Sequence, residues 1–308
     1  MKNSQTKNDI SPKKLLYLHT DLACECVPAE NSAPGVEHRS FDAGGFEAYE
    51  TLITSHKGAA ATGRKKGRYL TLFCPRLSSP DKPDAPELSS AICDLIRDFV
   101  HHMGFEITKN TSVLIAGLGN RFITSDAIGP KTADKIMATH QLKKESEAFS
   151  RLEVPSTAVL SPGVSSQSGL DASHLIKAAA QAINADFIIA IDALAARSTQ
   201  RLCSTVQISD SGIHPGSGIG NHRSPITKET MGVPVIAIGI PTVINSSTII
   251  FDALEKAEVG NISSEIEAIL NGSKGFFVTP GDSDTFCEDA SDVLSDAINQ
   301  AFLSKLYV

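Results

Sequence analysis

The sequence predicts a three-layer α/β/α fold around a mostly parallel central sheet, with a small β-rich region near its N-terminal end. From residue 113 onward, short continuous apolar runs alternate with segments of helical periodicity, as in parallel strands that helices cover on both faces. Before residue 75 the apolar runs are short and broken by glycine, which indicates a separate group of strands. With 308 residues, 41% of them hydrophobic, the chain can bury one large core or two small ones.

The first part of the chain is expected to hold a tail, the β-rich region and a linker. Residues 1–19 are polar and lysine-rich, so we interpret them as a flexible tail. Residues 20–308 are expected to form a single domain, whose β-rich portion covers about 20–85. Three prolines between 78 and 86 mark a linker. The expected strands are 36–38, 49–54 and 69–73.

Strands and helices then alternate to the end of the chain. The apolar run 187–191 is the strongest strand pattern in the sequence. Apolar residues recur at helical spacing from Leu88 to Phe99, and an alanine-rich helix begins after a capping Asp171. The expected strands are 113–116, 157–160, 187–191, 205–208 and 233–238, and the expected helices are 88–102, 126–140, 171–183, 247–256, 263–270 and 290–302.

Composition argues against several classes of protein. A net charge of −7 and a pI of about 5.7 are unlike the basic excess of a nucleic-acid-binding protein. No apolar run approaches the roughly 20 residues that span a bilayer, and the run 15–18 is too short for a signal peptide. The six cysteines form no C-x-x-C pair, so we interpret them as free thiols in a reducing compartment.

Three polar, glycine-containing segments follow predicted strands, where α/β sheets place their functional groups. The first contains Gly117, Gly119, Asn120 and Asp126; it resembles a dinucleotide loop, but Phe122 stands where that fingerprint needs its third glycine. Its glycines allow a tight turn and close backbone approach. Asp126 is then either a helix cap or a catalytic group.

The other two segments contain an aspartate and a histidine. Asp192 ends the apolar strand 187–191, where a buried charge is costly unless it is paired or protonated; Arg197 is the candidate partner. His214 precedes Gly216 and Gly218 in a glycine-rich loop. It is either a solvated loop residue or an accessory group or metal ligand at the site.

Two aspartates on neighbouring strand ends suit acid–base chemistry. Close carboxyl groups do not ionise together easily, so one can hold a proton while the other acts as a base. The base takes a proton from water and the acid protonates the departing group, as peptide hydrolysis requires. Asp126, Asp192 and His214 could instead hold a divalent metal that activates the water. A serine-hydrolase elbow is not supported, because Gln167 replaces the last glycine of that motif.

Long segments in one order resemble the spore germination protease family, peptidase family A25. The likeness runs from about residue 20 to 250. The matching segments are Thr20–Ala23, Gly117–Asn120 with Ser125–Pro130, Leu160–Val164, Ile189–Arg197, Gly212–Asn221 and Val233–Val243. Ser125 departs from the family pattern, which has proline before the aspartate.

The resemblance implies an endopeptidase that degrades small acid-soluble spore proteins at germination, in the forespore or spore core. It implies a phosphorylase/hydrolase-like fold similar to hydrogenase maturation proteases, and a homotetramer made as a zymogen, with residues 1–19 as propeptide. The family's two essential aspartates correspond to Asp126 and Asp192. In the hydrogenase maturation relatives the equivalent acidic positions and a histidine bind metal, so both an aspartate-type and a metal-assisted reaction stay open. Neither a nucleic acid nor a membrane is expected as a direct partner.

Other functions remain as alternatives. One is a metal-dependent maturation protease that acts on another protein, which would bind metal and lose activity to a chelator. Another is a non-catalytic sporulation regulator of the same fold, although that protein would lack the segment 20–23 and the β-rich region. A nucleotide-binding oxidoreductase ranks below both because of Phe122.

Overall fold

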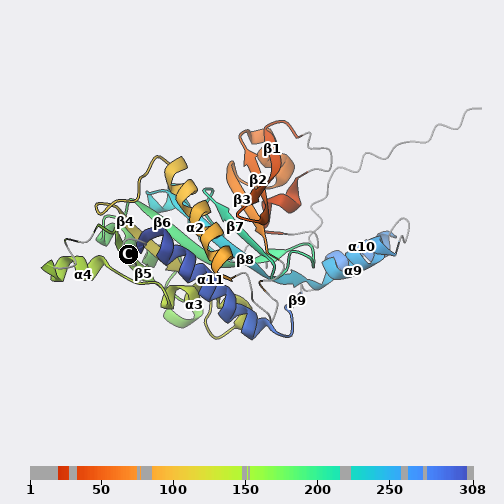
Figure 1. The fold of residues 1–308 in the computed structure, drawn as a ribbon. Coiled ribbons are helices and arrows are strands. Elements are labelled where there is room, and N and C mark those ends of the chain that lie inside the picture. The colour runs from red at the N-terminus through yellow and green to blue at the C-terminus, as the bar shows by residue number, and fades with distance from the viewer. Residues whose placement is uncertain are drawn as a thin grey trace, which may run out of the picture.

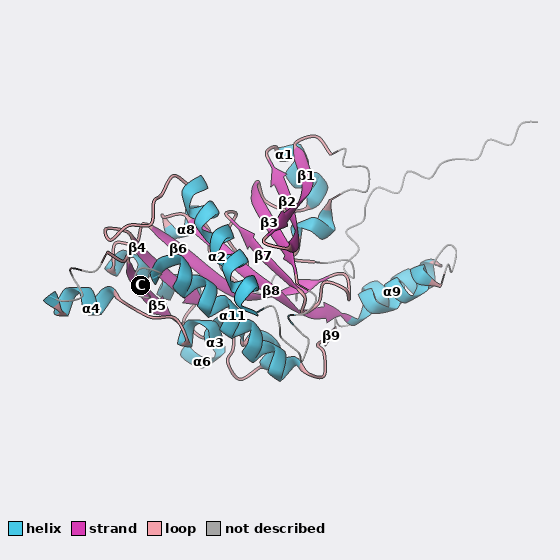
Figure 2. Cartoon of the chain, in the orientation of Figure 1, coloured by secondary structure: helices cyan, strands magenta, loops and turns pink. Residues whose placement is uncertain are grey.

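The computed structural model has one nine-stranded mixed sheet with helices packed against it (Figures 1 and 2). It describes residues 20–27, 33–74, 77, 85–147, 151, 153–215, 223–257, 263–272 and 276–303. The strands are β1 (Val36–Ala43), β2 (Phe46–Ile53), β3 (Gly67–Phe73), β4 (Ser112–Gly117), β5 (Ser156–Leu160), β6 (Phe187–Ala196), β7 (Thr205–Ser209), β8 (Val235–Asn245) and β9 (Phe277–Val278). The tail 1–19 and residues 78–84 of the expected linker lie outside the described residues, whereas its last two residues, Ala85 and Pro86, belong to a helix.

The helices mostly follow the predicted order. They are α1 (His56–Thr62), α2 (Ala85–His102), α3 (Ile128–Asp134), α4 (His140–Glu145), α6 (Ser165–Ser168), α7 (Ala172–Ala182), α8 (Lys228–Met231), α9 (Ser246–Lys256), α10 (Ser264–Gly272) and α11 (Ser283–Leu303), with short 3₁₀ turns η2 (Ala23–Cys26) and η4 (Thr124–Asp126). In Figure 1, α9 and α10 extend away from the sheet. Among the described residues, no helix combines the length and apolarity needed to cross a membrane.

The α/β class is confirmed, but the mostly parallel sheet is wrong. The strand order is β1-β2-β3-β7-β8-β6-β4-β5, with β9 beside β8. The three pairings among β5, β4, β6 and β8 are parallel, whereas the other five described pairings are antiparallel. β7 reverses direction and pairs with β3, which joins the N-terminal β-rich region to the same sheet. The three-layer arrangement stays a prediction.

Alternate residues of the central strands enter two separate core clusters. Ile115 and Ile189 face the cluster that contains the apolar sides of α2 and α11. Leu114 and Ile188 face the other cluster, which contains Ile176 of α7. Strands apolar on both faces are what a sheet buried on both sides requires, and this explains the continuous apolar runs in the sequence.

The predicted helix 126–140 is wrong in extent, because the chain leaves the helix after α3. The backbone nitrogen of Thr139 donates to the Thr157 oxygen (2.8 Å), and the Thr139 hydroxyl donates to the Pro155 oxygen (2.8 Å). The Thr157 nitrogen donates back to that hydroxyl (2.9 Å). Thr139 therefore docks on β5, and the backbone cannot also stay helical there. At the end of the chain, α11 starts seven residues before the predicted 290.

Candidate active site

Asp126 and Asp192 both lie just beyond the end of β4. The prediction that Asp192 ends its strand is wrong, because β6 continues to Ala196 through its pairing with β8. Asp192 belongs to β6 and stands opposite Gly239 of β8 in the register. On its other side, β4 pairs with β6 only as far as Ile191. The next residue of the β4 chain, Leu118, donates its N–H to the Ile191 oxygen (2.8 Å). The loop that leads to Asp126 therefore begins beside the backbone of Asp192.

Two glycines allow the start of α3 to approach these strand ends. A Cβ at Gly129 would lie 2.2 Å from the Leu118 oxygen and 2.5 Å from the Ile191 oxygen. A Cβ at Gly117 would lie 2.2 Å from the Gly129 oxygen. Carbon atoms cannot approach carbonyl oxygens this closely, so any other residue would push α3, and Asp126 before it, away from β6.

The loop between β4 and α3 also fixes the side chain of Asp126. Gly119 has φ +114°, and a Cβ there would lie 2.0 Å from the Asp126 carbonyl oxygen. This turn aims the Asn120 N–H at the Asp126 carboxylate, with 2.8 Å between Asn120 N and Asp126 Oδ2. From the sheet, the Thr242 hydroxyl donates to the Ser125 oxygen (2.6 Å) and ties η4 to β8.

Burial raises the pKa of both carboxyl groups, and more so for Asp192. The Asp192 residue is only 5% exposed, and burial is the main reason that its pKa lies well above the ordinary value. The negative charge of Asp126 raises the pKa of Asp192 further, while the Ala193 N–H, 2.9 Å from Asp192 Oδ1, lowers it. For Asp126, burial raises the pKa and the Asn120 N–H opposes that effect.

The pair therefore has one member that ionises first. Asp126 is partly exposed and accepts a backbone N–H, so its carboxylate form is the more stable of the two. Asp192 keeps its proton to higher pH because it is buried beside that carboxylate. The arrangement supplies a base and an acid at the same edge of the sheet.

Arg223 is a site residue that the sequence analysis missed. Its positive charge lowers the pKa of both Asp126 and Asp192. The next residue, Ser224, donates its hydroxyl to Asp171 Oδ2 (2.8 Å), the aspartate that caps α7. Only the position of Arg223 directly after the glycine-rich loop could have pointed to it in the sequence.

Arg197 and His214 are not placed as partners of the aspartate pair. No salt bridge joins Arg197 to Asp192 in the described part of the chain; the Arg197 backbone N–H instead donates to Glu25 Oε2 (2.8 Å). His214 is exposed. Its pKa is lowered by partial burial and by the charges of Lys65 and Arg64, while Asp21 opposes them.

The described residues do not fit a three-ligand metal site. No three histidine, cysteine, aspartate or glutamate side chains among them come together as metal ligands, so His214 does not join Asp126 and Asp192 in such a set. The loop positions Gly216 and Gly218 lie outside the described residues. Among the described residues, Asp126, Asp192 and Arg223 act on one another electrostatically at this site, and the charge of Asp21 also acts on Asp192.

The segment 20–26 packs against the end of β6, just beyond Asp192. The Asp21 N–H donates to the Ala195 oxygen (2.8 Å), and the Ala195 N–H donates to Asp21 Oδ2 (2.9 Å). Leu22 is fully buried in the core cluster that contains α7. The charge of Asp21 also raises the pKa of Asp192.

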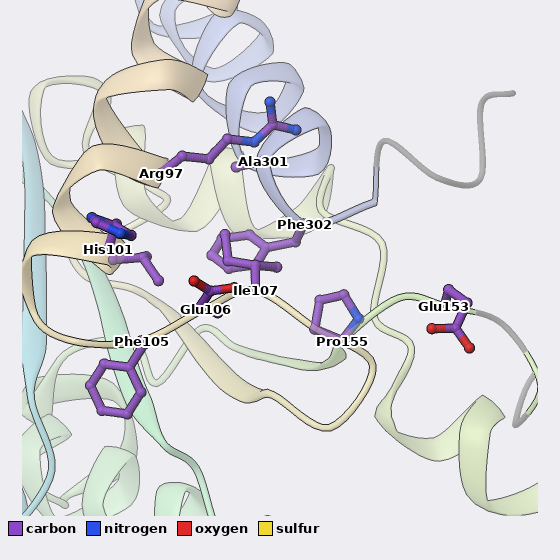
Figure 3. A pocket seen from close by; sticks show the side chains of 10 residues that line it. Arg97, His101, Phe105, Glu106, Ile107, Glu153, Pro155, Ala301 and Phe302 are labelled. Carbon is purple, nitrogen blue, oxygen red and sulfur yellow. The ribbon is translucent and has the colours of Figure 1, made fainter.

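A pocket of about 340 Å³ lies at the opposite end of the strands (Figure 3). Its lining includes Ile107, which precedes β4, and Pro155, which precedes β5. Figure 3 also shows Arg97 and His101 of α2 and Phe302 of α11 around it. Neither aspartate of the pair lines this pocket, so we give it no part in the chemistry.

Comparisons with known proteins agree on one family. The profile of the germination protease family matches residues 25–258. The germination protease of Bacillus subtilis (strain 168) is 39% identical over 247 residues, which cover 77% of this chain and 66% of that protein. The Priestia megaterium protein of the same name is 40% identical and is covered over 64% of its length, so the matches span just under two thirds of these two relatives. The germination protease of Clostridium acetobutylicum is 33% identical over 311 residues, which cover 92% of this chain and 94% of that protein.

Proposed function

Because the chain belongs to the germination protease family, we propose that it is an endopeptidase that cleaves small acid-soluble spore proteins at germination. The reaction is the hydrolysis of peptide bonds by water that an aspartate pair activates. The observation that carries the proposal is the position of Asp126 and Asp192 at one sheet edge, with the charge of one raising the pKa of the other.

Each aspartate has one role in this mechanism. Asp126, which ionises first, accepts a proton from the attacking water. Asp192, which is buried and protonated, donates its proton to the nitrogen of the departing peptide. Arg223 moderates the repulsion when both groups carry charge, since it lowers the pKa of each. The Asn120 N–H keeps the Asp126 carboxylate oriented.

The test is cleavage of a purified small acid-soluble spore protein by the full chain and by a chain that begins at Thr20. Asp126→Asn and Asp192→Asn should each lower kcat/KM at least about a hundredfold, because each removes one partner in proton transfer. The control is Asp186→Asn. Asp186 Oδ2 accepts the Ser112 N–H (2.8 Å) at the opposite end of the same strands, so this variant should cut normally.

A chelator arm separates this reaction from a metal-dependent one. Activity of the unmutated chain should survive a chelator, and added Zn²⁺ or Mg²⁺ should not raise it. If the chelator abolishes cleavage and a metal restores it, the aspartates are ligands and the acid–base roles are wrong. If the folded, trimmed chain never cuts, the endopeptidase proposal fails and a binding role replaces it.

The finer features belong to the same proposal and come from the resemblance to the family. They are the three-layer, phosphorylase/hydrolase-like fold, synthesis as a zymogen with residues 1–19 as propeptide, a homotetramer, and a location in the forespore or spore core. The exposed apolar side chains Ile250, Ile269 and Phe276, on and beside the projecting helices α9 and α10, support self-association. Light scattering on the purified chain tests the tetramer directly, and a monomer at micromolar concentration would contradict it.

A further inference from the structure

In the described part of the chain, one edge of β6 has no neighbouring strand after Asp192. β8 pairs with β6 as far as Ala196, but β4 pairs with it only as far as Ile191. The pairing with β8 also shifts register between Leu194 and Ala195. An unpaired strand edge at such a shift is free to move unless other groups bind its N–H and C=O groups.

Two carboxylates from the segment 20–26 bind this open edge. Asp21 forms a two-way bond with Ala195, through its own N–H and its Oδ2 atom. Glu25 accepts two successive backbone N–H groups, with Oε2 2.8 Å from Arg197 N and Oε1 2.8 Å from Ser198 N. Bonds from N–H groups to carboxylates are the stronger class of hydrogen bond.

The segment is itself held by other contacts. Gln207 of β7 bonds it twice: Gln207 Nε2 donates to the Asp21 oxygen (2.9 Å), and the Ala23 N–H donates to Gln207 Oε1 (2.7 Å). Leu22 and Ala23 are fully buried. The Thr20 hydroxyl donates to Glu25 Oε2. These contacts fix the segment 20–26 in the fold, so it can restrain the part of β6 that it binds.

We propose that Asp21 and Glu25 are positioning residues for Asp192: they complete the open edge of β6 and so hold the acid of the pair in place for proton transfer. The proposal rests on the function proposed above. Between Ile191 and Ala195, the Ala193 N–H is bound by the Asp192 carboxyl group itself. The orientation of the Asp192 carboxyl group therefore depends on the backbone at Ala193. Two residues further along β6, the backbone N–H of Ala195 is bound by Asp21.

The experiment measures amide hydrogen exchange at residue resolution in the full chain, with and without Glu25→Gln. A glutamine offers only one acceptor oxygen to the two N–H groups that Glu25 binds. Exchange should become about tenfold faster or more at Arg197, Ala195 and Ala193, and should not change at Ile189 on the same strand. Asp21→Ala, which removes the bond at Ala195, is the second variant in case the first does not fold.

Asp186→Asn is the matched control, since Asp186 binds a strand N–H at the other end of β6. It should leave exchange at Ala193 unchanged. In the form of the chain that cleaves, Glu25→Gln should lower kcat about tenfold and leave KM unchanged, because a displaced acid impairs proton transfer and not the binding of substrate.

Two results would overturn the proposal. One is unchanged exchange at Ala193 while Ala195 and Arg197 lose protection, since the segment would then cap the edge without holding Asp192. The other is faster exchange at Ala193 with unaltered kcat. The exchange measurement at Ala193 does not require an active protein. A chain that never cleaves would therefore refute the proposed function, while the exchange rates would still show whether Asp21 and Glu25 hold Asp192 in position.

Discussion

The buried carboxyl group of Asp192 makes the folded protein less stable when that group is ionised. It is 5% exposed and lies beside the charge of Asp126. A buried acid without a cationic partner in direct contact is expensive to ionise. Its raised pKa makes the folded state bind the proton more tightly than the unfolded state.

Asp192→Asn should therefore stabilise the protein at neutral pH. Stability from the protonated acid is fully present below the ordinary aspartate pKa and is lost as pH rises through the raised pKa in the folded state. The variant, which stays neutral, should match the unmutated chain near pH 4. At pH values above the raised pKa, the free energy of unfolding of the variant should exceed that of the unmutated chain by about 1.4 kcal/mol for each unit by which the pKa is raised.

Urea unfolding at fixed protein concentration between pH 4 and pH 8 measures this gain. Asp186→Asn serves as the comparison, because its carboxylate binds the Ser112 N–H and should stabilise the fold. A gain that does not depend on pH would argue against a raised pKa at Asp192.

Gly119 tests the geometry around the other aspartate. Gly119→Ala places a Cβ 2.0 Å from the Asp126 oxygen at φ +114°, so it should displace Asp126 and abolish cleavage. Gly104→Ala is the matched variant: its φ of +84° also lies in the range that L side chains rarely adopt, but no atom lies within 4 Å of the added Cβ. It should lose about 1–2 kcal/mol of stability and keep activity, and an active Gly119→Ala would contradict the geometry.

At this scale the sequence predicts the candidate pair but not its surroundings. Asp126 and Asp192 each come after an apolar run in the sequence, and that local pattern, together with the family motifs, makes them candidates. Arg223 and Glu25 act on the site from segments far away in the chain. No local pattern in a sequence reports such contacts between distant side chains.

Among the elements, α3 and α11 are joined by a network of charges next to the site. Lys135 Nζ lies 2.6 Å from both Glu288 Oε1 and Asp292 Oδ1, and Lys131 Nζ lies 2.8 Å from Glu288 Oε2. The two lysines lower the pKa of Glu288 to about 2. This contribution to stability is present above the ordinary glutamate pKa and is lost as pH falls toward 2.

Lys135→Met should lower the free energy of unfolding at pH 7 by about 0.5–1 kcal/mol, since these groups are partly exposed to water. The loss should shrink in 1 M salt, which screens the network. Lys109→Met breaks a more exposed ion pair with Glu153, whose side chains are 51% and 57% exposed, so it should change the free energy of unfolding very little. Equal losses from both variants in denaturant unfolding would contradict a network effect.

The elements also show why strand positions were predictable and strand directions were not. The apolar run 235–238 in β8 pairs parallel with β6 on one side and antiparallel with β7 on the other, so such a run does not reveal strand direction when both faces are covered. Direction depends on the connection, and the turn from β6 into β7 reverses the chain. Thr139 shows the same limitation, because its docking on β5 depends on a segment beyond the predicted helix.

On the scale of the whole molecule, one sheet serves two purposes. Its parallel part places Asp192, within β6, close to the loop that leads from β4 to Asp126, and its antiparallel part adds β1, β2 and β3 beyond β7. The two parts share continuous hydrogen bonding through β3 and β7. The sequence indicated a β-rich portion at about 20–85 within a single domain, but not that its strands extend the sheet that holds Asp192.

The pairing of β3 with β7 has a consequence for how the protein folds during its synthesis. β3 ends at Phe73, and its partner β7 begins only at Thr205. A ribosome adding roughly 5–20 residues per second needs on the order of ten seconds to make the stretch between them. During that time the N-terminal hairpins present an open strand edge to neighbouring nascent chains. Once β7 has left the ribosome, it can pair with β3. This pairing covers the open strand edge and lowers the risk of aggregation.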